Sequence, residues 1–292
     1  MKNNSLFVAF GLLILFAMNS YPQDDKPAYR LYDEQGRSVE YRQMISALSE
    51  ADIVLVGEYH NNPISHWMEY EITKSLYHIK DKRIILGAEM FEADMQLMLD
   101  EYLADIVSSD RFEADARLWS NYSTDYEPLV DFAKEMKVPF IATNIPRRYA
   151  DLLHRTGNAD TLRLLSDEAK QYIAPLPIPF KPDSIMLAEG QMMPMMSKNP
   201  LALAKAQSVK DATMAHFIYT NFHKEKVFIH FNGSYHSDHK DGIVYFLRIL
   251  DPKLKIATVS TAQQEDISIL DDAYKGIADF IICVPEAMTK TY

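Results

Sequence analysis

Residues 51–70 read ADIVLVGEYHNNPISHWMEY, and this stretch decides the expected fold. Its apolar run at 53–56 is short and rich in β-branched residues, which is typical of a buried strand. Gly57 ends the run, and turn residues follow. We expect Ser65 to cap a helix that runs over about residues 66–77. The pattern therefore predicts a strand, a turn and a helix in succession.

An acid and an imidazole follow this first strand. Glu58 and His60 come at the point where the strand would deliver its next residues into solvent. In open α/β sheets, ligands bind at the carboxyl ends of the strands. This turn is therefore a candidate site for binding or catalysis.

Further strands are expected along the chain, separated by helical stretches. Their apolar runs lie at residues 83–90, 138–143, 227–231, 256–260 and 279–284. A helix is expected at 41–48, before the first strand. Because strands alternate with helices, parallel pairing is favoured. The predicted fold class is α/β, with a mainly parallel sheet flanked by helices and a smaller inserted all-helical subdomain.

Two intervals between strands are too long for one crossover helix, and we expect them to form a helical lobe over the strand ends. The prediction is a single domain at 24–292, with an α/β core at about 40–93, 138–150 and 224–292 and a lobe at about 94–137 and 151–223. Prolines break the second interval at 174–183, which predicts an extended loop. The methionine-rich run at 186–196 is interpreted either as core packing or as an adaptable lid over a flat apolar ligand.

The first residues are predicted to be a signal peptide, residues 1–23. Lys2 precedes an apolar run at 6–18, which is shorter than the about 20 residues that span a bilayer. We expect cleavage between Ser20 and Asp24 and export to the periplasm or out of the cell, with no stable membrane span after cleavage. A retained anchor is the alternative.

Charge and cysteine content narrow the classes of partner. The formal net charge of -11 argues against a non-specific nucleic-acid binder. The single cysteine, Cys283, lies in an apolar run, so we expect it to be buried, and no intrachain disulfide can form. No cysteine ends the signal segment, which excludes lipid attachment there.

Polar residues follow four of the expected strands: Glu58 and His60, then Glu89, then residues 144–148, then His236. Parallel strands place their carboxyl ends on one edge of a sheet, so these side chains are predicted to converge. Two carboxylates and two imidazoles suit acid–base catalysis, and the set His60, Glu89 and His236 suits a divalent metal. The alternative is that each acid only caps the helix that follows it.

Other side chains near this edge are candidates for ligand binding. Arg147 either clamps a carboxylate or phosphate group or is a solvated residue at a helix start. His239 and Lys240 lie close to His236 in the sequence. Tyr59 and Tyr235 are candidate phenolate ligands of ferric iron, and the spacing does not select between them.

Five motifs occur in the order found in the ChaN-like family of bacterial haem-binding proteins, which this sequence resembles. They are GEYHNNPISHWMEYEI at 57–72, GAEMFE at 87–92, ATNIPRRYA at 142–150, QSVKDATMA at 207–215, and GSYH at 233–236 followed by GI at 242–243. The family belongs to a superfamily with the Tiki/TraB proteins and the erythromycin esterases. The resemblance spans roughly residues 51–250.

The resemblance implies haem bound at a homodimer interface, with tyrosine as the iron ligand and histidine and lysine of the other subunit meeting the propionates. The haem-binding candidates are Tyr59, Tyr235, His239, Lys240 and Arg147. An outer-membrane haem receptor is the implied partner. The enzymatic members of the superfamily use a Glu/His set that matches Glu58, His60, Glu89 and His236. We therefore expect an exported haem-binding protein that serves haem or iron uptake, and the alternative is a metal-dependent or Glu/His-based hydrolase.

Overall fold

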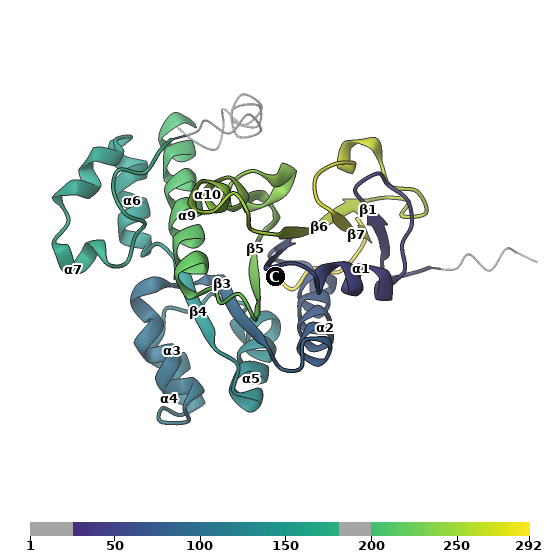
Figure 1. Cartoon of the computed structure of the whole chain (residues 1–292), viewed down its shortest axis with the longest axis horizontal. Helices are drawn as coiled ribbons and strands as arrows, with labels where there is room; N and C mark the ends of the chain where they lie inside the picture. Colours follow the sequence, from purple (N-terminus) through teal and green to yellow (C-terminus); the bar gives the residue numbers. More distant parts are fainter. Residues whose placement is uncertain (1–25, 181–199) are drawn as a thin grey trace, which may run out of the picture.

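A seven-stranded sheet forms the centre of the protein (Figure 1). The computed structural model describes residues 26–180 and 200–292. The strands lie in the order β1-β7-β6-β2-β5-β3-β4; β1 pairs antiparallel with β7, and the other pairs are parallel. They are β1 (Arg30–Asp33), β2 (Ile53–Glu58), β3 (Ile84–Glu92), β4 (Phe140–Asn144), β5 (Val227–Gly233), β6 (Ile256–Gln264) and β7 (Phe280–Pro285). The predicted α/β class with a mainly parallel sheet is confirmed.

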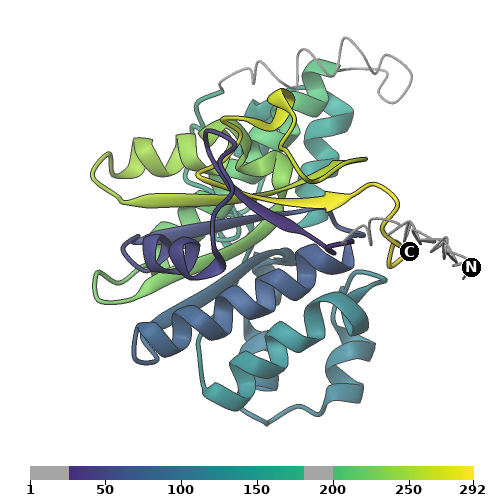
Figure 2. The same ribbon diagram turned by 90° about the vertical axis from the view of Figure 1, so that its right-hand side faces the viewer.

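Helices cover both faces of this sheet, as Figure 2 shows. On one face, Val54 and Val56 of β2 belong to an apolar cluster that also contains residues of α1 (Tyr41–Leu48), α2 (Pro63–Ile79), α3 (Gln96–Leu103), α4 (Ser109–Asp115) and α5 (Glu127–Met136). On the other face, Ile53 and Leu55 pack against α9 (Pro200–Asn221) and α10 (Ile243–Leu250). Successive side chains of a strand point to opposite faces, so one short apolar run serves both cores.

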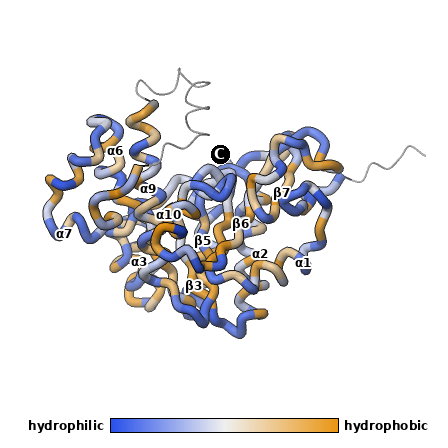
Figure 3. The backbone as a smooth tube through the Cα atoms, turned by 45° about the horizontal axis from the view of Figure 1, so that its top comes forward, coloured by the Kyte–Doolittle hydropathy of each residue, from blue (hydrophilic) through white to orange (hydrophobic). Residues whose placement is uncertain are grey.

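The remaining helices pack beside α9. A separate apolar cluster joins α6 (Arg147–Thr156) and η3 (Ala159–Leu164) to α9, and the short helix α7 (Asp167–Lys170) follows. The two intervals predicted to form a lobe therefore hold α3 to α5 and α6 to α9, and their division from the core stays a prediction. Figure 3 shows the hydrophobic residues concentrated in the central strands and the hydrophilic ones in the outer loops.

One strand was not predicted, and one helix start is wrong. The segment before α1 contains β1, which no apolar run in the sequence indicated; it pairs with β7 at the sheet edge. The helix α2 begins at Pro63 rather than near His66, because Asn62 is the cap: its Oδ1 accepts the backbone N–H groups of Ile64 (3.0 Å) and Ser65 (3.2 Å).

Several expectations concern segments outside the described residues. The signal peptide, the methionine-rich run and the end of the proline-rich loop lie there. Cys283 is buried and unbridged, as expected. Among the helices in the described parts of the chain, none is both long enough and apolar enough to span a bilayer.

Candidate functional site

A carboxylate–imidazole pair lies at the carboxyl end of β2. Glu58 is the last residue of the strand and is buried, and His60 Nδ1 lies 2.6 Å from Glu58 Oε1. Tyr126 donates to the same oxygen at 2.7 Å. Burial opposes the charged imidazole, but the hydrogen bond to Glu58 raises the pKa of His60 overall. Because the His60 side chain is 38% exposed, the pair offers an oriented imidazole that solvent can reach.

A second set of groups, called here the His236 cluster, contains Glu89, Asp211 and His236. His236 Nδ1 lies 2.5 Å from Asp211 Oδ1, and its Nε2 lies 3.2 Å from Glu89 Oε1. The backbone N–H of Gly233 donates to Glu89 Oε2 at 2.9 Å. Burial opposes the imidazolium, but the two carboxylates raise the pKa of His236 to about 10. Burial likewise disfavours the Glu89 carboxylate, yet His236 holds the pKa of Glu89 below its usual range. An imidazolium therefore lies between two carboxylates.

Gly233 joins the pair to the cluster. A Cβ atom at this position would lie 2.8 Å from His60 Cε1 and 3.6 Å from Glu89 Oε2, so only a glycine lets the imidazole lie so close to the end of β5. The structure thus brings together the four residues predicted to meet: Glu58, His60, Glu89 and His236.

The alternative, in which the two acids cap the helices after them, is wrong. Asn62 caps α2, and Glu92 occupies the N-cap position of the short helix η1 (Ala93–Met95). Glu89 lies inside β3, which continues past it to Glu92, and its two oxygens bind Gly233 and His236.

A third set, called here the His66 cluster, was not foreseen. It comprises Glu58, His66, Glu69 and Asp125, all buried. His66 Nδ1 lies 3.3 Å from Glu58 Oε2 and 3.2 Å from Glu69 Oε2, and its Nε2 lies 3.4 Å from Asp125 Oδ2. The missed signal was His-x-x-Glu on α2, since residues three apart share one helix face.

Protons are unevenly shared in the His66 cluster. Burial opposes the charged form of His66, but Glu58 and Glu69 raise its pKa to about 11. Burial and the neighbouring Glu58 raise the pKa of Glu69 well above its usual range. Burial would also raise the pKa of Glu58, but the hydrogen bond with His60 and the nearby charge of His66 hold it below its usual range. Glu58 is therefore the ionised carboxylate of the two glutamates.

A short π-helix supplies the remaining contacts. It is η2 (Tyr122–Tyr126), and such segments occur often at functional sites. Asn121, just before it, donates to the backbone carbonyl of His60 at 3.1 Å and to Asp125 Oδ2 at 2.6 Å. Thr291 donates to the same Asp125 oxygen at 2.9 Å. No sequence pattern marked these residues, because each acts through a long-range contact.

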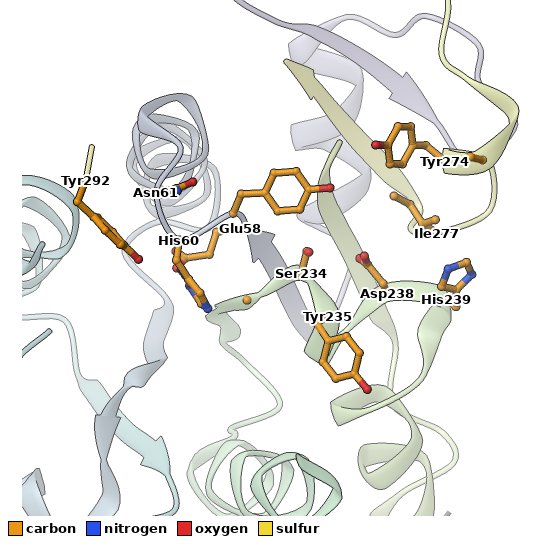
Figure 4. A pocket seen from close by; sticks show the side chains of 13 residues that line it. Glu58, His60, Asn61, Ser234, Tyr235, Asp238, His239, Tyr274, Ile277 and Tyr292 are labelled. Carbon is orange, nitrogen blue, oxygen red and sulfur yellow. Dashed lines mark hydrogen bonds and ion pairs between the residues drawn. The ribbon is translucent and has the colours of Figure 1, made fainter. Parts of the chain in front are cut away.

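One cavity of about 640 Å³, called here the tyrosine cavity, opens beside His60 (Figure 4). Its lining includes Tyr59, Tyr235, Tyr274, Tyr292, His60, Asp238, His239 and Ile277. Figure 4 shows His60 and Tyr292 at one end and Tyr274, Ile277 and His239 at the other. Phenol and imidazole groups therefore dominate the polar part of its wall.

A second cavity of about 720 Å³, called here the basic cavity, lies beyond Trp119 and Tyr292. Its charged lining residues are Arg117, Arg147, Arg148, Lys210, Glu89 and Glu92. Tyr292 lines both cavities, and the His60 ring contacts Trp119 edge-on with centroids 4.9 Å apart. His60 thus lies between a phenol-rich space and a cationic one.

The candidates for haem contact are divided between these spaces. Tyr59, Tyr235 and His239 line the tyrosine cavity, whereas Arg147 is exposed and lines the basic cavity. Lys240 lines neither cavity: its ammonium group is paired with Glu34 at 2.9 Å and Asp279 at 2.8 Å.

Together these features define an α/β protein with a buried Glu/His site at the carboxyl edge of its sheet. The sequence matches, over residues 44–247, the family described as haem-binding uptake, Tiki superfamily, ChaN. The match covers well over half of the chain, so the protein belongs to this family. No curated protein matches the sequence.

Solved structures share the fold. One described as cofacial heme binding to ChaN of Campylobacter jejuni superposes with a TM-score of 0.66 at 17% identity, covering 87% of this chain and 96% of that chain. An erythromycin esterase mutant in its open conformation gives 0.52 at 10% identity, covering 91% and 99%. A Bacillus cereus protein gives 0.50 at 13%, covering 84% and 90%. At these identities the likeness concerns the fold alone.

Proposed function

We propose that the protein binds haem in the tyrosine cavity, beside His60 at the carboxyl edge of the sheet, in the service of haem or iron uptake. The observation that carries this proposal is a single cavity of about 640 Å³ that combines phenol and imidazole groups in a chain of the haem-binding family. Cofactor sites have volumes of this order, and tyrosine is an established axial ligand of haem iron. When bound, haem would supply a ferric centre that accepts an oxygen ligand.

Tyr235 is the proposed iron ligand. It is half-buried and lies two residues after the end of β5, with its ring edge-on to His236 at 5.7 Å between centroids. Burial, together with Tyr274 and Asp238, raises the pKa of Tyr59 well above its usual range. A phenolate at Tyr59 is therefore costly, which argues against this tyrosine as the iron ligand.

Side chains that can donate hydrogen bonds to the two propionates lie on both sides of His60. His239 is exposed at the edge of the tyrosine cavity, and Arg147 and Lys210 line the basic cavity. Lys240 contributes less in this proposal, because Glu34 and Asp279 already neutralise it. Charge-assisted hydrogen bonds from such groups would orient the porphyrin.

A hemin titration tests the proposal. Wild-type protein should give a saturable Soret band, and Tyr235→Phe should weaken binding by about tenfold or more, as expected when an interaction worth at least 1.4 kcal/mol is lost. Tyr59→Phe is the matched control, with a phenol lost from the same cavity, and should change the affinity less. A wild-type spectrum identical to that of free hemin would overturn haem binding, and a larger loss in Tyr59→Phe would move the ligand to Tyr59.

Export, dimerisation and a receptor belong to the same proposal. The apolar segment at 6–18 supports export, which fractionation of cells that express the full chain would test. Family membership supports a homodimer with haem at its interface, and sedimentation with and without hemin would test it. An outer-membrane haem receptor is the proposed partner, and co-purification with hemin present would test that contact.

A second candidate function is hydrolysis. It is favoured by the 2.6 Å contact between buried Glu58 and half-exposed His60, because a carboxylate-oriented imidazole is the arrangement of a general base. Glu89 and His236 would help to position the reacting group. Arg147 would bind the anionic part of a substrate. Ester and peptide substrates should then be cleaved by wild type and not by His60→Gln. Equal rates in both proteins would remove this candidate.

A further inference from the structure

One hydrogen bond determines which ring nitrogen of His66 carries a hydrogen. The carbonyl oxygen of His60 can only accept, so His66 Nε2, 3.1 Å away, must carry the hydrogen of that bond. The other ring nitrogen, Nδ1, then faces Glu58 Oε2 at 3.3 Å and Glu69 Oε2 at 3.2 Å. Histidine ligands of metals are held in this way, with the second N–H donated to a carbonyl or carboxylate.

Two carboxylate oxygens of the cluster have no hydrogen-bond partner among the described residues. They are Glu58 Oε2, which lies 3.3 Å from His66 Nδ1, and Glu69 Oε1, although both side chains are completely buried; the other Glu69 oxygen, Oε2, is the one within hydrogen-bond distance of Nδ1 at 3.2 Å. One ligand atom each from Glu58, His66 and Glu69 lies within 4.8 Å of the others. The separations of 3.2 and 3.3 Å from Nδ1 are close to the roughly 3.4 Å between neighbouring ligands when a tetrahedral ion has bonds of about 2.1 Å.

We propose that Glu58, His66 and Glu69 bind one divalent transition-metal ion of the Zn²⁺ or Mn²⁺ class. Imidazole nitrogen and carboxylate oxygen are ligands that such ions accept. Three carboxyl groups, those of Glu58, Glu69 and Asp125, surround a single imidazole. A bound divalent cation would displace the proton that Glu69 holds without metal and neutralise the charge of the two glutamates. The ion is a resident of the protein and is distinct from haem, so this inference does not depend on the proposed haem function.

The ion would act on the site through Glu58. One oxygen of this carboxylate faces the metal position, and the other holds His60 at 2.6 Å. The metal position and His60 therefore share one carboxylate, which links the ion to the imidazole that lies between the two cavities.

Protons are the alternative to a metal ion in the His66 cluster. An imidazolium at His66 and a neutral acid at Glu69 would satisfy the same contacts without a metal. The substitution Glu69→Gln separates the two accounts, because the amide has nearly the shape of the neutral acid but cannot replace an anionic ligand. Glu71→Gln is the matched control: it lies on the same helix, is only partly buried, and pairs with Lys74 at 2.6 Å away from the cluster.

The experiment uses tag-free full chain, stripped with a chelator and kept free of haem. Calorimetric titration with Zn²⁺ and with Mn²⁺ should give one ion per chain for at least one metal, with elemental analysis confirming the ratio. Glu69→Gln should weaken binding by more than about 100-fold, beyond what loss of a supporting contact costs, and Glu71→Gln should bind as wild type does.

Absence of binding in wild type, or equal affinity in Glu69→Gln, would overturn the proposal in favour of protons. Circular dichroism of the metal-free variants checks folding. A normal hemin titration alongside a failed metal titration, or the reverse, shows which of the two proposals has failed.

Discussion

The His236 cluster and the His66 cluster use the same residue types and reach different states. In the His236 cluster both ring nitrogens face carboxylates, and the second oxygen of Glu89 accepts the N–H of Gly233. In the His66 cluster one ring nitrogen faces both the carbonyl of His60 and Asp125, and two carboxyl groups lie against the other. The extra carboxyl group and the backbone carbonyl therefore separate a satisfied ion pair from an arrangement that holds either an added proton or, as proposed, a metal ion.

The largest effect is expected on breaking the satisfied cluster. Asp211→Ala leaves the buried His236 imidazolium with one carboxylate, and removing one partner of a buried pair costs about 3–5 kcal/mol. Urea unfolding of metal-free, haem-free protein measures this. Asp151→Ala, which removes an exposed partner of Arg155, should stay within about 0.5 kcal/mol. Similar losses in the two variants would mean that the cluster is not a coupled unit.

Glutamate-to-glutamine changes should separate the two clusters directly. Glu89 is ionised in the folded protein, so Glu89→Gln should cost about 3 kcal/mol or more of unfolding free energy. The pKa of Glu69 is raised, so without metal its neutral form resembles glutamine, and Glu69→Gln should cost less than about 1 kcal/mol. The same unfolding assay with a chelator present compares them, and a reversed order would contradict the assigned protonation states.

The clusters should also differ in the pH range over which they lose stability. The folded pKa of His236 is raised to about 10, so its contribution is complete below about pH 6.5 and disappears as pH rises towards 10. The pKa of Glu69 is also raised, so its contribution begins to fall above about pH 4.3. In His236→Gln, the urea midpoint should fall less with rising pH in the alkaline range. In Glu69→Gln, it should fall less between acidic and neutral pH. If both variants keep the pH dependence of wild type, the clusters do not differ in the way described.

The smallest loss of unfolding free energy is expected at an exposed ion pair. Lys240 is about as exposed as its partner Glu34, so Lys240→Ala should cost less than about 1 kcal/mol. The Lys240→Ala protein should bind hemin with the affinity of wild type, because the ammonium group of Lys240 lies outside the tyrosine cavity. A marked loss of hemin binding would return Lys240 to the haem contacts.

Much of the fold could be predicted from local pattern. The apolar run at 53–56 identified β2, and the runs at 227–231 and 256–260 identified the strands beside it, because buried parallel strands are nearly continuous in apolar residues. The antiparallel strand β1 was missed, since its pairing with β7 depends on a partner about 250 residues away. Local periodicity carries no record of such a contact.

The site was predictable where strand topology alone brings residues together. Glu58, His60, Glu89 and His236 all follow or lie near strand ends that share one edge, so their meeting follows from parallel pairing. Asp125 and Asp211 come from η2 and α9, and their direction depends on how those helices pack. His66 and Glu69 stood in the quoted stretch, but their helix face becomes informative only once Glu58 is known to lie against it.

Iron-edge anomalous diffraction from crystals grown with hemin tests the central claim most directly. The account predicts a strong iron peak in the tyrosine cavity, at bonding distance from the phenol oxygen of Tyr235. An iron peak in the basic cavity, or haem bound away from both Tyr235 and His60, would contradict it.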